Sequence, residues 1–302
     1  MTLLYYDLYA LILEKLEEGD DIYTLAHCAL VCRDFSNIVK RLLYQTIRLF
    51  PSRNASRVCA ALYTSLSAHP HLAKSIQNLH LRDLSYAEGC GLRNWMALDQ
   101  KLHLLLQVLQ PHIRSLSVEG IGRLQCRYFA PGLRDAFRFV FQGPSLEEVR
   151  LSNLDQFPIL PFHSLGRNVK RLAMWSLVLT EPDFYELQSI PLPLRLLTES
   201  ATPEIGTNHE PSRPWIQLES LMVYCHGLER LLFDMVQKHV DFSKMKKLCL
   251  IPASSQDIES MQSWVTSSSS SLEHLTISPW PSCTYHCLYT SALCVELITT
   301  IP

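Results

Sequence analysis

The chain has 302 residues, of which 47% are hydrophobic, and this is enough apolar material for a large folded core. Its 27 basic and 29 acidic residues give a formal net charge of −2, which disfavours nucleic acid as a partner. No segment approaches the ~18 uninterrupted apolar residues of a membrane span. The first residues also lack the basic start of a signal peptide, so we expect a cytoplasmic or nuclear protein without membrane contact.

Three short helices are predicted at the start of the chain. Apolar residues recur there at steps of three and four within 4–16, 22–31 and 35–43, which is typical of the buried stripe of a helix. Gly19 suits the end of the first helix, and Asp20 or Asp21 suits the start of the second. A module this small buries little surface by itself, so an exposed apolar face on it would indicate a partner.

Two stretches of this module resemble the F-box motif. The first covers residues 4–16 and begins Leu4-Tyr5-Tyr6-Asp7-Leu8, and the second covers residues 25–35. Its most specific part is Leu30-Val31-Cys32-Arg33, followed by an aromatic residue at position 35. The family usually has proline after the first leucine, where this chain has tyrosine. The resemblance covers about residues 3–50 and so defines a first domain over residues 1–50.

The resemblance implies that the first domain docks onto a Skp-type adaptor, which bridges to a cullin–RING ubiquitin ligase. Such a substrate receptor holds an unidentified protein substrate on its second domain and needs no catalytic residue of its own. The residues proposed for the adaptor face, some of which must instead face the module's own core, are Leu4, Tyr5, Leu8, Ile12, Leu30, Val31 and Phe35. The alternative is a non-catalytic repeat scaffold with a vestigial F-box, because the missing proline belongs to the surface that the adaptor grips.

The remaining residues, 51–302, repeat the pattern apolar-x-x-apolar-x-apolar. Copies start at residues 76, 113, 146, 169, 218, 245 and 272, with a weaker copy at 194. The last five steps fall within the range of leucine-rich repeats, about 20–29 residues. Each copy predicts a short strand, and the segments between copies carry helical stripes. These predict a helix over 102–109 capped by Asp99, helices over 134–142 and 228–239, and helices that begin at Thr180 and Ser255.

We therefore expect an α/β fold in which a three-helix F-box is followed by a curved, leucine-rich-repeat-like solenoid with a parallel sheet and helices on its outer face. The asparagine ladder of such repeats is mostly missing, and Asn153 lies one position early, so the repeats should be irregular. In this they resemble the large fungal class of F-box proteins with leucine-rich repeats. Function is expected on the polar positions between the leucines and on loops such as 86–94 and 198–214.

No motif indicates catalysis, a metal or a cofactor. The patterns GxSxG, GxxxxGK[ST], HExxH and GxGxxG are all missing from the sequence. The ten cysteines are scattered without a CxxC pair, which favours free thiols in a reducing compartment. Cys283, His286 and Cys287 lie close in sequence, but zinc would need a fourth ligand from elsewhere. An enzyme whose site the motifs do not reveal would be indicated by ionisable groups of perturbed pKa in a deep pocket.

Overall fold

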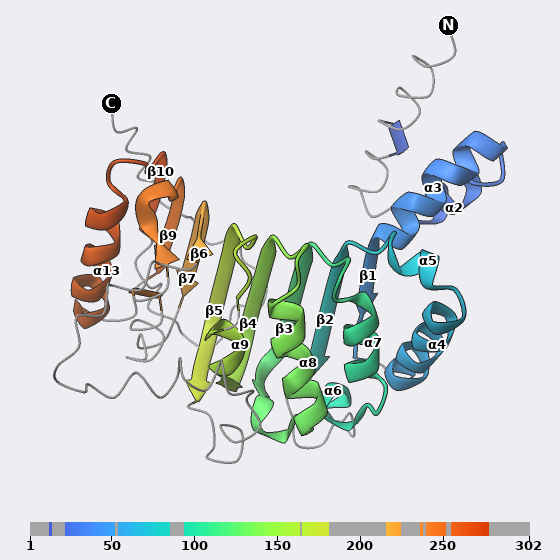
Figure 1. Ribbon diagram of the computed structural model, residues 1–302, viewed down its shortest axis with the longest axis horizontal. Helices are drawn as coiled ribbons and strands as arrows, with labels where there is room; N and C mark the ends of the chain where they lie inside the picture. The colour runs from blue at the N-terminus through green and yellow to red at the C-terminus, as the bar shows by residue number, and fades with distance from the viewer. Residues whose placement is uncertain are drawn as a thin grey trace, which may run out of the picture.

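The structure, a computed structural model, describes residues 12–13, 22–51, 54–84, 94–163, 165–180, 216–224, 236–237, 240–251 and 255–277. These residues form a mixed α/β fold around one parallel sheet of eight strands (Figure 1). The sheet is open, with β1 at one edge and β10 at the other, and its strands follow the order of the chain. Parallel neighbours require the chain to cross back between successive strands, and helices supply many of these crossovers.

The strands coincide with the repeated pattern of the sequence. For every copy within the described residues, a strand begins two residues after the first residue of the copy, so the predicted strands are confirmed. The copy at 194 lies outside the described residues. The eight strands are β1 (Thr46–Leu49), β2 (Asn78–Leu84), β3 (Ser115–Gln125), β4 (Glu148–Pro158), β5 (Arg171–Thr180), β7 (Ser220–Tyr224), β9 (Lys247–Ile251) and β10 (His274–Ile277). A separate two-stranded sheet joins β6 (Ile216–Gln217) to β8 (Val240–Asp241).

Strand β1 was not predicted. It follows directly on a helix, α3 (Arg33–Gln45), and pairs in parallel with β2, with Thr46 opposite Asn78. The domain boundary predicted at residue 50 groups these four strand residues with the helices, whereas their pairing places them in the sheet.

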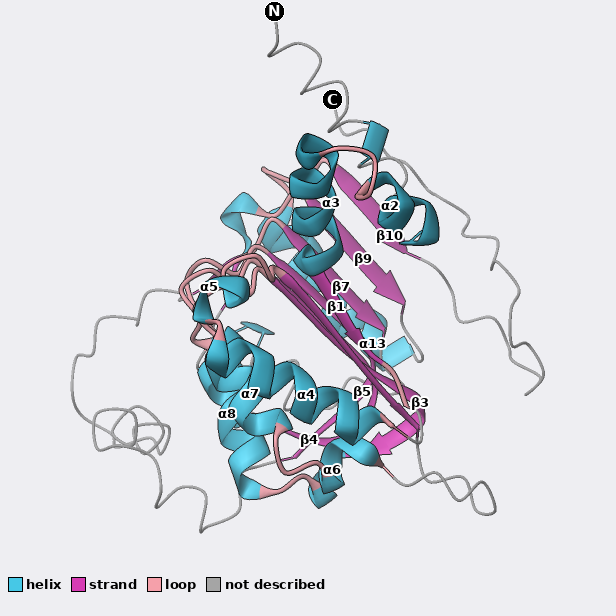
Figure 2. Ribbon diagram, turned by 90° about the vertical axis from the view of Figure 1, so that its right-hand side faces the viewer, coloured by secondary structure: helices cyan, strands magenta, loops and turns pink. Residues whose placement is uncertain are grey.

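The two faces of the sheet differ in burial because side chains alternate along each strand. One face is apolar and buried, and Figure 2 shows α4 (Ala55–Ala68), α7 (Leu102–Leu109) and α8 (Pro131–Phe141) together on this side of the sheet. The first row of buried residues across the sheet is Leu79, Leu116, Val149, Leu172, Leu221 and Leu248, and the second is Leu81, Val118, Leu151, Met174, Val223 and Leu250. The opposite face carries polar, charged and aromatic residues.

Several predicted helices are found. The Asp99 carboxylate accepts the Leu102 N–H at 2.6 Å, which confirms the expected cap of α7. The helices expected over 134–142 and from 255 are α8 and α13 (Ser255–Ser268). The other short helices are α5 (Pro70–Ala73), α6 (Trp95–Leu98), α9 (Leu160–His163), η1 (Cys126–Tyr128) and η2 (Phe242–Lys244). The helix expected from Thr180 falls outside the described residues, as does that over 228–239 except for residues 236–237.

A cluster of phenylalanines fills the space between β4 and the helices that cover it. Phe157 of β4 lies with its ring centroid 5.9 Å from those of Phe137 and Phe162 and 6.4 Å from that of Phe141. All four side chains are fully buried. Aromatic pairs at these separations stabilise the core beyond the area that they bury.

Asp83 is the fully buried carboxylate of β2. It accepts the backbone N–H groups of Trp95 and Met96, at 3.2 and 2.8 Å. These are the first two residues of α6, whose N–H groups have no acceptor within the helix. The indole N–H of Trp95 also donates to the Arg82 carbonyl at 2.9 Å, so the end of β2 and the start of α6 are joined by three hydrogen bonds.

The N-terminal helices have a small core of their own, separate from that of the sheet. The described part consists of residues 12–13, which are helical, α2 (Ile22–Cys28) and α3. Its buried residues are Leu13, Leu25, Ile38, Val39 and Leu42. Figure 1 places this helical module beyond β1, at one end of the sheet. Within the described ranges, none of the helices is both long and apolar enough to cross a membrane.

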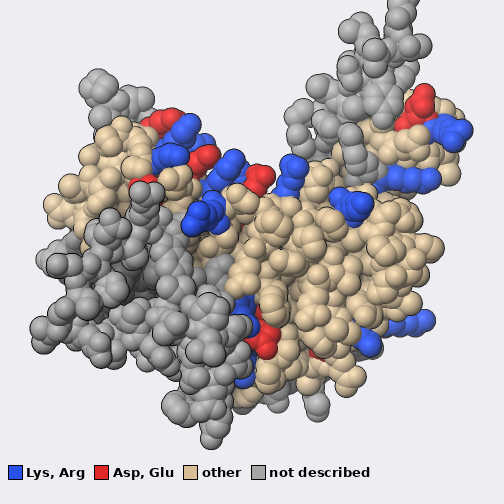
Figure 3. Space-filling model, viewed as in Figure 1, with Lys and Arg blue, Asp and Glu red and all other residues tan. Residues whose placement is uncertain are grey.

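Charges of alternating sign line the edge at which the strands begin. The residues that immediately precede the first residue of β3, β4, β5, β7, β9 and β10 are Arg114, Glu147, Lys170, Glu219, Lys246 and Glu273. A backbone hydrogen bond joins each of them to the next. Lys246 and Glu273 also form an ion pair at 3.6 Å. Figure 3 shows Lys and Arg beside Asp and Glu along this upper edge of the molecule. From β3 to β10, neighbouring strands therefore meet with opposite charges, whereas the uncharged Gln45 and Gln77 precede β1 and β2.

Candidate functional site

The face of the sheet opposite the core helices is the candidate functional site, and we call it the open face. Its residues stand in three rows set by the strand register. The first row is Thr46, Asn78, Ser115, Glu148, Arg171, Ser220, Lys247 and His274; the second is Arg48, His80, Ser117, Arg150, Ala173, Met222, Cys249 and Thr276; the third is Arg82, Glu119, Ser152, Trp175 and Tyr224.

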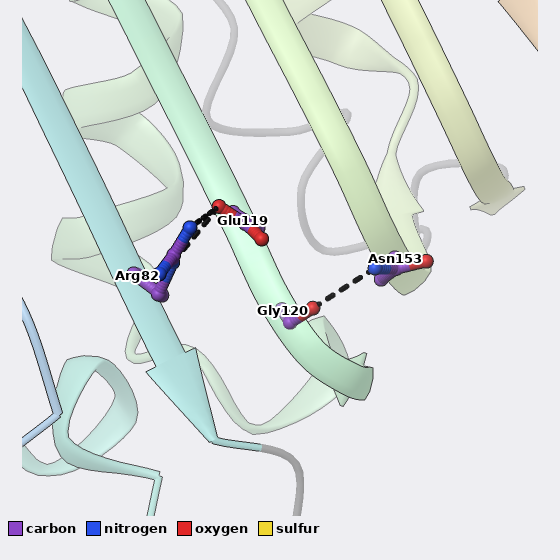
Figure 4. A network of polar contacts seen from close by, with 4 residues as sticks. All are labelled: Arg82, Glu119, Gly120 and Asn153. Carbon is purple, nitrogen blue, oxygen red and sulfur yellow. Dashed lines mark hydrogen bonds and ion pairs between the residues drawn. The ribbon is translucent and has the colours of Figure 1, made fainter. Parts of the chain in front are cut away.

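The half of the open face nearest β1 is basic. Arg82 donates from Nε and one Nη to the same Glu119 oxygen, at 2.9 and 2.7 Å. The largely buried Glu148 carboxylate accepts Arg150 Nε on one oxygen and Arg171 Nη2 on the other. Both glutamates thus orient arginines whose side chains remain about half exposed. Figure 4 shows the Arg82–Glu119 contact between β2 and β3.

The pKa of His80, on β2, is lowered by its surroundings in this basic half of the open face. Burial lowers its pKa first, and the nearby positive charges of Arg48 and Arg150 lower it further, while Glu148 opposes the shift. A histidine whose pKa lies below its ordinary value is mostly uncharged at neutral pH. His80 therefore offers a neutral imidazole within a cationic setting.

Beyond β4, the third row of the open face is aromatic, and Met222 of the second row adjoins it. The Trp175 and Tyr224 rings lie 4.0 Å apart between centroids, on the neighbouring strands β5 and β7. Trp175 is 41% exposed, and Met222, one row earlier on β7, is 39% exposed. Aromatic side chains with one open face are common anchors of binding surfaces.

A close approach of β3 and β4 lies just beyond the third row of the open face. Asn153 Nδ2 donates to the Gly120 carbonyl at 3.1 Å, as Figure 4 shows. Asn153 has a φ of 55°, a left-handed conformation that asparagine tolerates better than most residues. Asn153 lies one position early for the expected asparagine ladder. Its side chain nevertheless bridges β3 and β4, because the register between these strands shifts after Glu119.

The sequence alone did not single out these open-face residues. It placed function on the polar positions between the leucines, and the open face is made of those positions. The sequence does not reveal the strand register, and Arg48, Arg82 and Trp175 lie on one surface only when the strands are aligned in that register. Aligning the repeats at the positions two and four residues after each strand begins would have found Arg82 and Trp175, whereas Arg48 lies on β1, which was not among the predicted copies.

The residues predicted for the adaptor face have different positions. Ile12, Leu30 and Val31 are 49%, 83% and 71% exposed. Phe35 instead packs partly against the module's own core, as expected for some of the set. Leu4, Tyr5 and Leu8 lie outside the described residues. Tyr23, 83% exposed on α2, was not in the predicted set although it lies on the same module.

Metal chemistry finds no support among the described residues, which contain no group of three or more His, Cys, Asp or Glu side chains placed to hold an ion. Cys283, His286 and Cys287 lie outside this part of the chain. The described cysteines are free thiols. Burial raises the pKa of Cys59 to about 12, with further contributions from the Asp99 charge and hydrogen bond, and burial also raises the pKa of Cys126.

Thiol alkylation should follow exposure and pKa. With iodoacetamide at about pH 8, we expect the exposed Cys32 to react and Cys59 and Cys126 to stay unmodified until the chain is denatured, because the thiolate is the nucleophile. Peptide mass mapping before and after denaturation measures the order. Rapid native-state alkylation of Cys59 would contradict the buried position of this side chain on α4.

Comparison with known proteins identifies no relatives: no family model matches the chain, and no curated protein matches it.

Proposed function

We propose that the chain is a substrate-recognition subunit of an SCF-type cullin–RING ubiquitin ligase, with an F-box that binds a Skp-type adaptor and a leucine-rich-repeat-like solenoid that binds the substrate. The observation that carries the proposal is the exposure of Leu30 and Val31 on a small helical module. These two residues also belong to the segment that most resembles the F-box. Two adjacent aliphatic side chains that face solvent on so small a module suit burial by a partner protein.

The arrangement of the two parts suits this role. The helical module lies at the β1 edge, and its buried core is separate from that of the sheet (Figure 1). A partner on Leu30 and Val31 therefore leaves the open face available to a second protein. The receptor would act by raising the local concentration of substrate near a charged ubiquitin-conjugating enzyme, so it needs no catalytic residue.

The proposal is tested by retention of purified Skp-type adaptor on the intact, immobilised chain. Leu30→Ser and Val31→Ser should each weaken retention by about tenfold, as expected for apolar side chains buried at an interface. The matched controls are Leu98→Ser on α6 and Val58→Ser on α4, which replace apolar side chains that are also more than half exposed but lie away from the helical module. The controls should retain the adaptor as the unmodified chain does.

Each outcome separates the proposal from its alternative. Retention that depends on Leu30 and Val31, with adaptor-dependent ubiquitination of a bound protein, supports the ligase subunit. No retention by the unmodified chain rejects the ligase role and favours the repeat scaffold with a vestigial F-box. Equal loss in the control variants would show that the loss is not specific to Leu30 and Val31 and would reject these side chains as the adaptor-binding site.

A further inference from the structure

We propose that the open face binds an extended acidic segment of a partner protein, with its carboxylates on the arginines of β1–β5 and a large apolar side chain about four residues away on Trp175 and Tyr224. This deepens the substrate-binding half of the proposed function and rests on it for the identity of the partner as a substrate. The binding itself depends only on the sheet.

Charge complementarity selects an acidic partner. Across β1–β5, the three rows of the open face carry four arginines, Arg48, Arg82, Arg150 and Arg171, against Glu119 and Glu148. Both glutamates are already engaged by arginine, so the surplus of two positive charges faces outward. A guanidinium has five N–H donors, so an arginine held by one carboxylate retains donors for a second.

The electrostatic surroundings of His80 are consistent with this surplus of positive charge on the open face. Besides burial, the charges of Arg48, Arg150 and Arg82 lower its pKa, and the Glu148 carboxylate opposes them. The cationic character therefore belongs to the group of strands and not to a single side chain. Charge-assisted hydrogen bonds from such a group to a carboxylate are shorter and stronger than neutral ones.

The aromatic half selects an apolar side chain beside the acidic residues. Trp175 and Tyr224 stand opposite one another in register, and Met222 extends the patch one row toward the start of β7. Their side chains come from two neighbouring strands, so the patch lies in the plane of the sheet. An aliphatic or aromatic side chain laid on it would be removed from water on one side.

Strand spacing sets the distance between the two parts of the ligand. Arg82 on β2 and Trp175 on β5 are three strands apart in the sheet order. Neighbouring strands lie about 4.8 Å apart, and an extended chain advances about 3.3 Å per residue, so about four residues span the gap. A continuous phosphate backbone fits less well, because Glu119 and Glu148 lie among the arginines and would repel some of its charges.

The test is a binding titration of the full chain by fluorescence anisotropy. The probes are labelled peptides that carry two adjacent glutamates and one phenylalanine, separated by about one to seven serine or glycine residues. We expect the tightest binding at a separation of about four residues. Arg82→Gln, Arg150→Gln and Trp175→Ser should each weaken it by about tenfold. Peptides with lysines in place of the glutamates should not bind.

The matched control is Arg57→Gln on α4, an exposed arginine on the helical side of the sheet, which removes the same charge and should leave affinity unchanged. Thermal unfolding of every variant establishes that the fold is kept. The inference is overturned if no peptide binds, if separation has no effect, if Arg57→Gln loses as much as Arg150→Gln, or if a single-stranded oligonucleotide binds where the peptides do not.

The adaptor is omitted from this titration, so a failure of the proposed acidic-segment binding can be told apart from a failure of the proposed ligase role. Peptide binding without adaptor retention keeps the open face as a binding surface and rejects the ligase subunit. Adaptor retention without peptide binding keeps the ligase subunit and rejects the acidic segment.

Discussion

Phe157→Ala should lower the free energy of unfolding by about 3–5 kcal/mol, the usual cost of truncating a buried phenylalanine. The side chain is fully buried and lies against three further phenylalanine rings from α8 and α9. Those rings are held by separate elements, so they cannot collapse together into the space without moving a helix. Urea denaturation followed by circular dichroism measures the loss.

Phe139→Ala is the matched control for this prediction. Phe139 lies on α8, as Phe137 does, but it is 42% exposed with the Arg138 guanidinium 5.5 Å from its ring. Its truncation should cost less than about 1 kcal/mol, as is usual for surface positions. Similar losses for Phe139→Ala and Phe157→Ala would refute the assignment of the phenylalanine cluster to the core.

Gly120→Ala should lower the free energy of unfolding by about 1–3 kcal/mol, because the new methyl group has no space. A Cβ at this position would stand 2.4 Å from the Asn153 carbonyl oxygen and 2.9 Å from that of Gly122, both backbone atoms. The strand must shift to accept it, which would disturb the Asn153 bond to the Gly120 carbonyl shown in Figure 4. Chemical denaturation of the variant measures the cost.

Gly132→Ala provides the opposite expectation for the same chemical change. Gly132 lies in the first turn of α8, where an added Cβ would meet only the His103 ring at an ordinary 3.5 Å. Alanine favours the helix over glycine by up to about 1 kcal/mol, so this variant should be neutral or more stable. Destabilisation by both alanines to the same extent would disprove the close β3–β4 approach.

The positions of the strands were predictable because each one buries two residues of a regular pattern. Leu116 and Val118 of β3, for example, are the second and third apolar positions of the copy that starts at residue 113. The pattern depends on burial against helices, and this physical requirement is local enough to be visible in one sequence. Helix α7 was equally clear, since Asp99 supplies a cap and a leucine stripe follows.

Helix α4 and strand β1 are among the elements that were missed, for different physical reasons. Helix α4 buries Ala55, Cys59 and Leu66 at helical spacing, but two of these residues are too small to stand out as an apolar stripe. Strand β1 has only four residues and follows α3 without a loop, so it resembled the end of the helix. Tyr44, Ile47 and Leu49 do match the repeated apolar pattern, but they continue the apolar stripe of α3 without a break, so this copy was not recognised.

The candidate site was less predictable than the fold. Arg82 and Glu119 are 37 residues apart in the chain, yet they bond across neighbouring strands. In the helical module, Leu30 and Phe35 are similar in hydrophobicity, and only their packing separates an exposed side chain from one that leans on the core. Composition indicates which residues are apolar, whereas tertiary contacts decide which of them remain available to a partner.

The alternating charges at the start of the strands disfavour incorrect pairing of strands in this sheet. Strands with nearly the same apolar pattern could exchange places or skip one repeat during folding, with little change in what they bury. A skipped strand would bring Arg114 beside Lys170, or Glu147 beside Glu219, and like charges on adjacent strands are destabilising. The penalty at one position is small, but it recurs along the edge and favours assembly of the sheet in the order of the chain.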